Sequence, residues 1–303
     1  MRVASIDCGT NSIRLLIADV SGDNFREVAR DMEIVRLGQG VDKTGAFDPE
    51  AVARTLKATR KYSEAIASKG VEKVRFCATS ATRDASNRQI FIDGVREILG
   101  IEPEVIPGTE EAALSFMGAT KELSKHDAPF LVVDIGGGST EFVLGRNEVE
   151  QAISVNIGCV RMSERHLNTQ PPSQDQIQAA IKDIDDAIQT AGKTVQFDNA
   201  QTLIAVAGTA TTVAAAALDL PEYDRYSIHL SRISAQKVHD VAAMFSLMTR
   251  EEIAALPYMH PGRVDVITSG SLVLSRVMHW TGASEFVASE SDILDGMAWS
   301  LAK

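Results

Sequence analysis

Two stretches of this chain share one pattern, and that repetition constrains the fold more than any other feature of the sequence. The first stretch is VASIDCGTNSIRLLIADV at residues 3–20, and the second is FLVVDIGGGSTEFVLG at residues 130–145. Each has an apolar run with an aspartate, then a turn of glycine and hydroxyl residues, then a second apolar run. This order predicts two strands joined by a tight turn, and its recurrence predicts an internally duplicated chain. The matched pairs are Asp7 with Asp134, Gly9 with Gly136, Thr10 with Gly137, and Ser12 with Ser139.

Helices and strands alternate through the rest of the chain. In the clearest helix, Asp48 is a capping residue, Pro49 suits the first helical position, and Gly70 ends the run. Thr109 is the expected cap of a second helix, over residues 109–123. This alternation predicts an α/β architecture in which helices cover a largely parallel or mixed sheet. Further helices are expected over 86–100, 234–247, 261–279 and from about 291, and further strands over 25–37, 71–78, 102–106, 202–207 and 284–289.

Length and composition set the number of domains and exclude some classes of partner. With 303 residues, of which 45% are hydrophobic, the chain suits two domains of ordinary size. The polar segment SKHDAP at residues 124–129 is the best candidate for their junction, which gives domains over 1–124 and 125–303. The net charge of −11 argues against a nucleic-acid or membrane-surface partner, so a polyanionic substrate must meet a local positive cluster.

The cysteines and the N-terminus bear on the cellular compartment. Three cysteines, odd in number and without a CxxC pattern, favour neither a disulfide framework nor a zinc site. The N-terminus lacks the basic, apolar and small-residue segments of a secretory signal, and no apolar run has the length needed to span a bilayer. We therefore expect a soluble, cytoplasmic protein.

The glycine turns are suited to holding phosphate. Backbone N–H groups can converge on an anion only where no Cβ obstructs the approach, and glycine provides that access. The alternative is that both are ordinary hairpin turns, for which Gly, Asn and Asp are favoured anyway. The recurrence of the pattern favours the phosphate interpretation. The residues expected to bind phosphate are Thr10, Asn11 and Ser12 in the first turn, and Gly136, Gly137, Gly138, Ser139 and Thr140 in the second.

A third glycine site follows the strand expected at 202–207. Gly208 ends that strand and Thr209 opens a helix, whose N-terminal amides and dipole favour an anion. Threonine also caps helices for purely structural reasons, and the sequence leaves both interpretations open.

Acidic residues beside the turns are candidates for metal binding and for activating water. Asp134 ends its strand and is well placed to hold Mg²⁺ directly or through water, and Glu141 and Asp7 are expected to share the ion. Glu110 and Glu111 lie in the first turn of a predicted helix, where the helix dipole alone favours carboxylates. A structural role for these two residues is therefore the competing interpretation.

Arg83 is the candidate cation. It follows a predicted strand in a loop of small polar residues, where a guanidinium can bind phosphate through two hydrogen bonds. The competing interpretation is a surface arginine that pairs with its neighbour Asp84.

These motifs, taken in order, resemble a known family. The three glycine sites resemble the actin, heat-shock ATPase and sugar-kinase superfamily. More narrowly, the chain resembles the short form of the exopolyphosphatase and guanosine pentaphosphate phosphohydrolase family over nearly its whole length. The motifs that carry this resemblance are IDCGTNSIRLLI, VRLGQGV, ATSATRDASN, IPGTEEAALSFMGA, VVDIGGGSTEFVLG, VAGTATTVAA, HPGRVDVITSG and SESDILDGM.

The resemblance implies both a fold and an activity. The fold is α/β, with two duplicated actin-like, or ribonuclease H-like, domains and an interdomain cleft, and the last helix, about 291–303, packs back on the first domain. The activity is hydrolysis of the terminal phosphoanhydride of inorganic polyphosphate with Mg²⁺ or Mn²⁺, and guanosine pentaphosphate and ATP are further candidate substrates. Glu111 is then the general base, with Glu110 beside it, and Arg83 stabilises the transition state. Homodimers are expected.

Two other functions suit the same superfamily. One is a kinase that transfers phosphate to a small acceptor, and the other is a nucleotide-gated binding protein. The carboxylate at Glu111 favours the hydrolase, because a kinase needs a base directed at an acceptor pocket.

Overall fold

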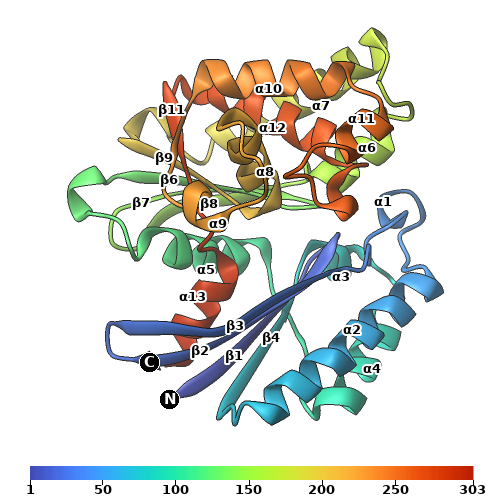
Figure 1. The fold of residues 1–303 in the computed structure, drawn as a ribbon, viewed down its shortest axis with the longest axis vertical. Helices are drawn as coiled ribbons and strands as arrows, with labels where there is room; N and C mark the ends of the chain where they lie inside the picture. Colours follow the sequence, from blue (N-terminus) through green and yellow to red (C-terminus); the bar gives the residue numbers. More distant parts are fainter. Residues whose placement is uncertain (303) are drawn as a thin grey trace. The chain divides into compact units, whose positions relative to one another are not determined.

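The computed structural model describes residues 1–302 and divides into two compact units (Figure 1). Unit 1 contains Met1–Gly118 and the segment from Ile293 onward, and unit 2 contains Ala119–Asp292. The chain first passes from unit 1 to unit 2 between Gly118 and Ala119. The predicted junction at residues 124 and 125 lies a few residues later, inside unit 2. The chain returns from unit 2 to unit 1 between Asp292 and Ile293, so the C-terminal segment belongs to unit 1.

Unit 1 is built on a mixed five-stranded sheet in the order β3-β2-β1-β4-β5. β1 (Arg2–Cys8) and β2 (Ser12–Ser21) form the first predicted hairpin, and β3 (Asn24–Ile34) pairs antiparallel with β2. β4 (Lys73–Ala78) runs parallel to β1, and β5 (Glu104–Val105) runs parallel to β4. Because β1, β4 and β5 are parallel, the loops that follow them leave the same edge of the sheet.

Helices cover both faces of this sheet. Alternate residues of a strand point to opposite faces, so Ile6 of β1 packs in the core formed with α2 (Pro49–Ser68) and α4 (Gln89–Leu99). Val3 points the other way and packs in a core formed with α13 (Ile293–Leu301). The C-terminal helix therefore belongs to the core of unit 1. Unit 1 also contains α1 (Val41–Thr44), α3 (Ser80–Asp84) and all but the last two residues of α5 (Gly108–Thr120).

Unit 2 is built on a six-stranded sheet in the order β10-β11-β9-β6-β7-β8. The hairpin of β6 and β7 is the second one predicted, and β9 runs parallel to β6. The turns that follow β6 and β9 therefore leave one edge of this sheet. The strands are β6 (Phe130–Ile135), β7 (Thr140–Gly145), β8 (Val149–Val155), β9 (Thr202–Val206), β10 (Arg232–Ser234) and β11 (Glu285–Ala288).

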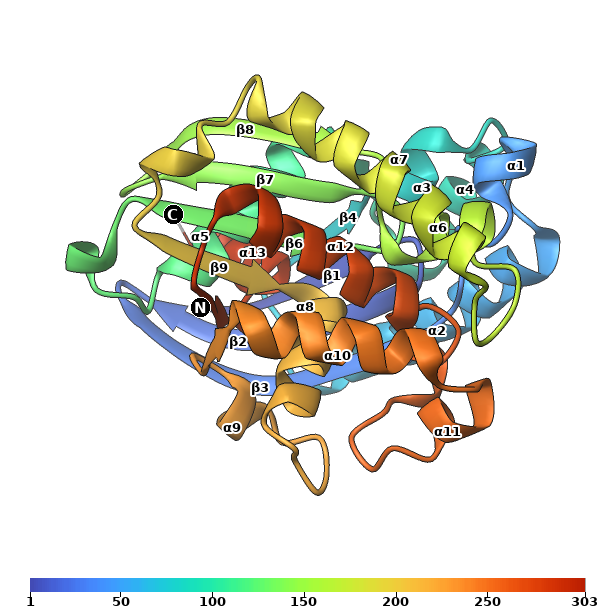
Figure 2. The same ribbon diagram turned by 90° about the horizontal axis from the view of Figure 1, so that it is seen from above.

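Three long helices lie over one face of the unit 2 sheet. Figure 2 shows α7, α12 and α10 in front of its strands, and their apolar residues join those of the sheet in one core. No helix among residues 1–302 combines the length and apolar character that a bilayer crossing requires. The helices of unit 2 are α6 (Cys159–His166), α7 (Gln174–Gly192), α8 (Ala207–Ala217), α9 (Arg225–Ile228), α10 (Ala235–Leu247), α11 (Arg250–Ala254) and α12 (Ile267–Thr281).

The predicted duplication is confirmed at two levels. The strand order β3-β2-β1-β4 of unit 1 matches the order β8-β7-β6-β9 of unit 2, with the same parallel and antiparallel pairings. The turns also match, because the Gly9 amide donates to the Ser12 carbonyl at 2.9 Å and the Gly136 amide donates to the Ser139 carbonyl at 3.0 Å. The two turns are therefore equivalent elements of two similar units.

Several predicted boundaries differ from the structure. Arg83, expected in a loop, lies in the short helix α3, which has too few residues to produce a visible apolar period. Thr109 lies inside the first turn of α5 instead of capping it. The helix expected at 261–279 begins at Ile267, after a 3-10 turn at Pro261–Arg263. The Asp48 cap is confirmed, since its carboxylate accepts from two amides of the first turn of α2.

Candidate active site

The edge of unit 1 carries the first aspartate. Asp7 lies directly opposite Arg14 in the pairing of β1 with β2. Arg14 donates to Asp7 Oδ2 from Nη2 at 2.6 Å and from Nε at 3.1 Å. Asp7 is 5% exposed, and the guanidinium offsets the cost of burying its charge. The carboxylate predicted to share a metal ion therefore already has a cation beside it.

The first glycine turn is fixed through its carbonyl groups. The Thr10 carbonyl accepts from the Gly38 amide at 2.8 Å, and the Asn11 carbonyl accepts from the Arg36 amide at 2.8 Å. A Cβ on Gly38 would lie 2.3 Å from Thr10 Cγ2, so a larger residue here would displace the Thr10 side chain. Thr10, Asn11 and Ser12 thus lie in a turn that the segment after β3 holds in place.

Two of the predicted catalytic residues meet at the same edge. Arg83 follows β4 and Glu111 follows β5, and Arg83 Nη1 donates to Glu111 Oε2 at 2.7 Å. The same nitrogen donates to the Ile106 carbonyl at 2.9 Å. No acceptor among residues 1–302 binds Nε or Nη2 of Arg83, so these two nitrogens remain available to an anion. Both side chains are partly accessible, at 22% for Arg83 and 12% for Glu111.

Glu110 has different neighbours from Glu111. Consecutive residues of a helix point about 100° apart. Glu110 pairs with Arg75 at 2.6 Å, and Arg75 also binds Glu104 and the Ser300 hydroxyl. Glu110 is therefore part of an ion-pair network that ties α5 to β4 and α13.

The second glycine turn packs its carbonyl groups on the start of α6. The Gly136 carbonyl accepts from the Cys159 amide at 2.9 Å, and the Gly137 carbonyl accepts from the amides of Val160 and Arg161 at 2.9 and 3.1 Å. The Gly138 carbonyl accepts from the Gly158 amide at 3.2 Å and from Arg161 Nε at 2.7 Å. No acceptor among residues 1–302 binds the amides of Gly137, Gly138 and Ser139. These three donors suit a phosphate.

The remaining polar groups of this turn have partners within unit 2. The Gly136 amide donates to the Ser139 carbonyl, and the Thr140 hydroxyl donates to the Ile157 carbonyl at 2.9 Å. The Ser139 hydroxyl donates to Glu141 Oε1 at 2.7 Å. Of the polar groups of this turn that were predicted to bind phosphate, the hydroxyls of Ser139 and Thr140 bind protein groups and stabilise the turn.

Asp134 and Glu141 form the candidate metal site. They are direct cross-strand partners in the pairing of β6 with β7, so their side chains share one face, and both are buried, at 6% and 1% exposure. No group of three or more His, Cys, Asp or Glu side chains within residues 1–302 is arranged to hold a metal ion. Magnesium commonly binds through one or two carboxylates and completes its shell with water and substrate. This pair of oxygen donors fits that requirement.

At the third glycine site, glycine is required by the packing of the protein itself. A Cβ on Gly208 would lie 2.4 Å from Cζ of Arg263, whose Nη1 donates to the Gly208 carbonyl at 2.8 Å and to the Thr212 hydroxyl at 2.6 Å. Thr209 is buried against Gly270, where a Cβ would lie 2.6 Å from its Oγ1. Gly208 therefore makes room for Arg263, and Gly270 makes room for the Thr209 side chain. The site brings the guanidinium of Arg263 to the edge after β9.

The chain matches one protein family over most of its length. The Ppx/GppA phosphatase family matches residues 16–303. This chain belongs to that family. Exopolyphosphatase 2 of Mycobacterium tuberculosis is 47% identical over 314 residues, which cover 99% of this chain and 98% of the relative.

Solved structures agree with this membership. An exopolyphosphatase-like protein has a TM-score of 0.96 and 46% identity, covering 100% of this chain and 99% of that protein. An exopolyphosphatase from Cytophaga hutchinsonii has a TM-score of 0.90 and 27% identity, covering 100% and 98%. The family resemblance and the duplicated fold inferred from the sequence are confirmed, and the chain is a hydrolase of the Ppx/GppA family.

Three residues near the turns of this Ppx/GppA chain could not be identified from local sequence pattern. Arg161 is 9% exposed and binds the Gly138 carbonyl, and Ser154 donates to Glu141 Oε1 at 2.6 Å from the facing position on β8. Arg263 lies over the Tyr223 ring at 5.9 Å. None of the three lies in a glycine turn, although Arg263 belongs to the family motif HPGRVDVITSG.

Near the third glycine site, the Tyr223 hydroxyl and the Cys159 thiol are both uncharged at neutral pH. Burial raises the pKa of Tyr223 to about 12, and its hydroxyl hydrogen-bonds to Thr211 and Glu290. Burial also raises the pKa of the Cys159 thiol, which argues against a nucleophilic role because the thiolate is the reactive form. The other two cysteines are buried as well.

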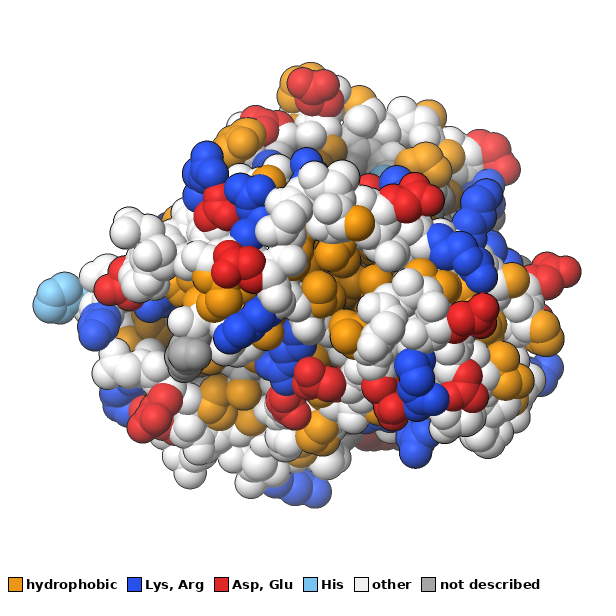
Figure 3. All heavy atoms as spheres, turned by 90° about the horizontal axis from the view of Figure 1, so that it is seen from below, with side chains coloured by type: hydrophobic (Ala, Val, Ile, Leu, Met, Phe, Trp, Pro, Cys, Tyr) orange, Lys and Arg blue, Asp and Glu red, His pale blue; other side chains and the backbone are white. Residues whose placement is uncertain are grey.

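The positive groups of the site are individual arginines. Figure 3 shows basic and acidic side chains interspersed over one face of the molecule. In unit 1, Arg14 binds Asp7 and Arg83 binds Glu111. In unit 2, Arg161 binds the Gly138 carbonyl and Arg263 binds the Gly208 carbonyl.

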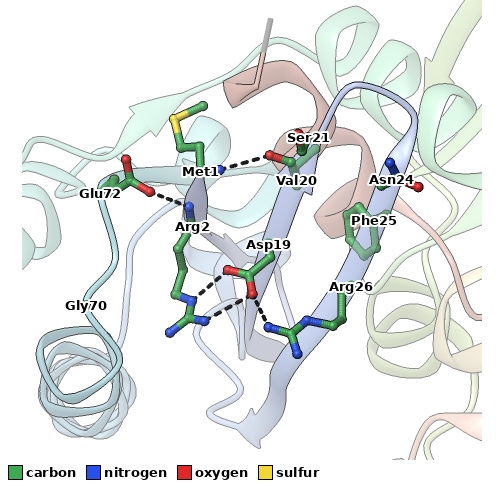
Figure 4. A pocket seen from close by; sticks show the side chains of 10 residues that line it. All are labelled: Met1, Arg2, Asp19, Val20, Ser21, Asn24, Phe25, Arg26, Gly70 and Glu72. Atoms are coloured by element: carbon green, nitrogen blue, oxygen red, sulfur yellow. Dashed lines mark hydrogen bonds and ion pairs between the residues drawn. The ribbon is translucent and has the colours of Figure 1, made fainter.

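A pocket of about 710 Å³ lies at the other end of the unit 1 sheet (Figure 4). It is lined by the first residues of β1, the end of β2 and the start of β3. Its two arginines, Arg2 and Arg26, both pair with Asp19, at 2.8 and 2.5 Å. These pairs hold the pKa of Asp19 well below its usual range. The pocket is separate from the predicted site residues, and its charges compensate one another.

Proposed function

We propose that this protein is an exopolyphosphatase, which hydrolyses the terminal phosphoanhydride of inorganic polyphosphate and releases orthophosphate. The observation that carries the proposal is the turn at Gly136–Ser139, where three consecutive amides point away from their own structural support. Membership of the Ppx/GppA phosphatase family supports it, as does the similarity to relatives named exopolyphosphatase.

Unit 2 binds and polarises the phosphate in this proposal. The amides of Gly137, Gly138 and Ser139 donate to its oxygens, and their position is fixed before the substrate arrives. Asp134 and Glu141 would hold Mg²⁺ or Mn²⁺, and a bound divalent ion offsets the negative charge of the phosphate oxygens. Asp7 already shares its carboxylate with Arg14, so we assign the metal to the unit 2 pair.

Unit 1 supplies the acid–base chemistry. Glu111 takes a proton from the attacking water, the new P–O bond forms, and the bond to the leaving polyphosphate breaks. Arg83 holds the Glu111 carboxylate through Nη1, and its other two nitrogens donate to phosphate oxygens as charge shifts in the transition state. Glu110 has a structural role through Arg75.

Steady-state phosphate release tests the proposal, with polyphosphate, guanosine pentaphosphate and ATP as separate substrates and no acceptor present. We expect release from polyphosphate, and we expect Glu111→Gln to slow turnover by roughly 10²-fold or more while KM stays near the wild-type value. Glu110→Gln is the matched control, since it changes the neighbouring carboxylate, and its turnover should stay near wild type. Acceptor-dependent use of ATP without release from polyphosphate would instead indicate a kinase.

A further inference from the structure

We propose that Arg161 is a positioning residue, which holds the Gly136–Ser139 turn with its amides directed at the phosphate. The inference rests on the proposed function, because it takes this turn as the phosphate-binding element. Arg161 comes from α6 and is 9% exposed, and its Nε donates to the Gly138 carbonyl at 2.7 Å. Its own amide donates to the Gly137 carbonyl at 3.1 Å.

The direction of the turn amides follows from peptide geometry. In a trans peptide the C=O of one residue and the N–H of the next point in opposite directions. The carbonyls of Gly136, Gly137 and Gly138 all accept hydrogen bonds from the start of α6 or from Arg161. The N–H groups of Gly137, Gly138 and Ser139 belong to the same three peptides and therefore point away from α6.

Arg161 acts on the last of these three peptides. The Gly158 amide reaches the Gly138 carbonyl at 3.2 Å, whereas Arg161 Nε reaches it at 2.7 Å. Hydrogen bonds from a charged donor are shorter and about twice as strong as those from a neutral one. The guanidinium is thus the stronger of the two groups that orient the Gly138–Ser139 peptide. By polarising this peptide it also strengthens the Ser139 N–H as a donor.

Burial makes this contact costly to lose. Arg161 is buried, and a buried guanidinium requires hydrogen-bond partners for its donors. Gly138 in the turn and Gly158 before α6 let the two backbone segments approach closely. A Cβ on Gly158 would lie 2.2 Å from the Gly137 carbonyl carbon. The turn and the start of α6 therefore form one tightly packed unit, in which the side chain at 161 sets the orientation of the final peptide.

Orthophosphate binding to the turn tests the proposal directly. The probe is inorganic phosphate with Mg²⁺, and the readout is hydrogen–deuterium exchange of the peptide that spans residues 136–140. The variants are Arg161→Met and Arg161→Lys, and Arg165→Met is the control, because Arg165 lies on the same helix and pairs with Asp183 instead. Steady-state kcat and KM on polyphosphate are measured alongside.

We expect phosphate to protect this peptide in the wild type and in the control, and to need at least tenfold higher concentration in both Arg161 variants. We expect kcat to fall by roughly 10²-fold, the scale found when one donor to a developing anion is lost. Lysine keeps the charge but has no donor at the position of Nε, so wild-type protection in Arg161→Lys would overturn the positioning role. If Arg161→Met does not fold, as judged by circular dichroism, Arg161→Lys decides alone.

The exchange readout separates this inference from the proposed function. If the wild type releases no phosphate from polyphosphate but Arg161 variants lose phosphate protection, the exopolyphosphatase proposal fails and the positioning role stands. If polyphosphate is hydrolysed and the variants match the wild type in both measurements, the positioning role is wrong. Absence of protection in the wild type overturns it as well.

Discussion

Replacement of Gly158 by alanine is expected to damage the phosphate turn more than the protein as a whole. The new Cβ would lie 2.2, 2.3 and 2.4 Å from Gly137 C, Gly137 O and Gly138 N, where ordinary contacts begin at 3.4 Å. All three are backbone atoms, so no side-chain rotation relieves the overlap, and the turn must retreat by about 1 Å. A misplacement of about 1 Å in a catalytic group can cost roughly 10²-fold in rate.

The same substitution should lower the free energy of unfolding only moderately, whereas it should lower the rate of phosphate release strongly. Overpacking costs about 1–3 kcal/mol, and the hydrogen bond from the Gly158 amide to the Gly138 carbonyl is weakened at the same time. A loss of about 2 kcal/mol lowers the unfolding midpoint by roughly 4–8 °C for a domain of this size. The protein should therefore remain folded at 25 °C while kcat for phosphate release falls by about 10²-fold.

Phosphate release and thermal unfolding, measured on the same preparations, check this prediction. Gly192→Ala is the matched control, because the nearest atom to its Cβ is Phe197 Cε2 at an ordinary 3.5 Å. Alanine at position 192 should leave activity unchanged and stability equal or higher by about 0.5 kcal/mol. Wild-type kcat in Gly158→Ala would refute the claim that the turn and the start of α6 form one tightly packed unit.

Three further predictions concern the metal pair, the C-terminal helix and the effect of pH. Ser154→Ala removes a hydroxyl from Glu141 and should raise the Mg²⁺ concentration for half-maximal phosphate release by roughly tenfold, while an unchanged metal titration would contradict a supporting role. Asp295→Asn breaks the partly buried pair with Arg30, which keeps Glu27 as a partner, and should cost about 1–3 kcal/mol in urea unfolding, and a cost below about 0.5 kcal/mol would show that this pair does not anchor α13. Hydrogen bonds from His229 and Ser291 lower the pKa of Glu122, so its contribution to stability is present above the unfolded value and is lost as pH falls through the folded value. Glu122→Gln should therefore reduce the loss of thermal stability between pH 7 and pH 3, and an unaltered pH dependence would count against this assignment.

Most of the secondary structure and the duplication could be predicted from the sequence because they depend on local pattern. The hairpins of β1 with β2 and of β6 with β7 follow from continuous apolar runs on both sides of glycine turns. The helix α2 follows from the Asp48 cap, Pro49 and Gly70. By contrast, β8 and α6 were missed, because half-exposed strands and short helices carry no clear period.

The sequence by itself determined that two equivalent glycine turns exist and which residues of them could bind an anion or a cation. Tertiary structure decided which groups meet. Arg83 pairs with Glu111, 28 residues away, because β4 and β5 are parallel neighbours. Arg161 reaches Gly138 across 23 residues because α6 begins against the turn. Strand order and register determine which side chains meet across the fold. The spacing of apolar residues in the sequence predicts only which face of a helix or strand is buried, and does not indicate which element packs against that face.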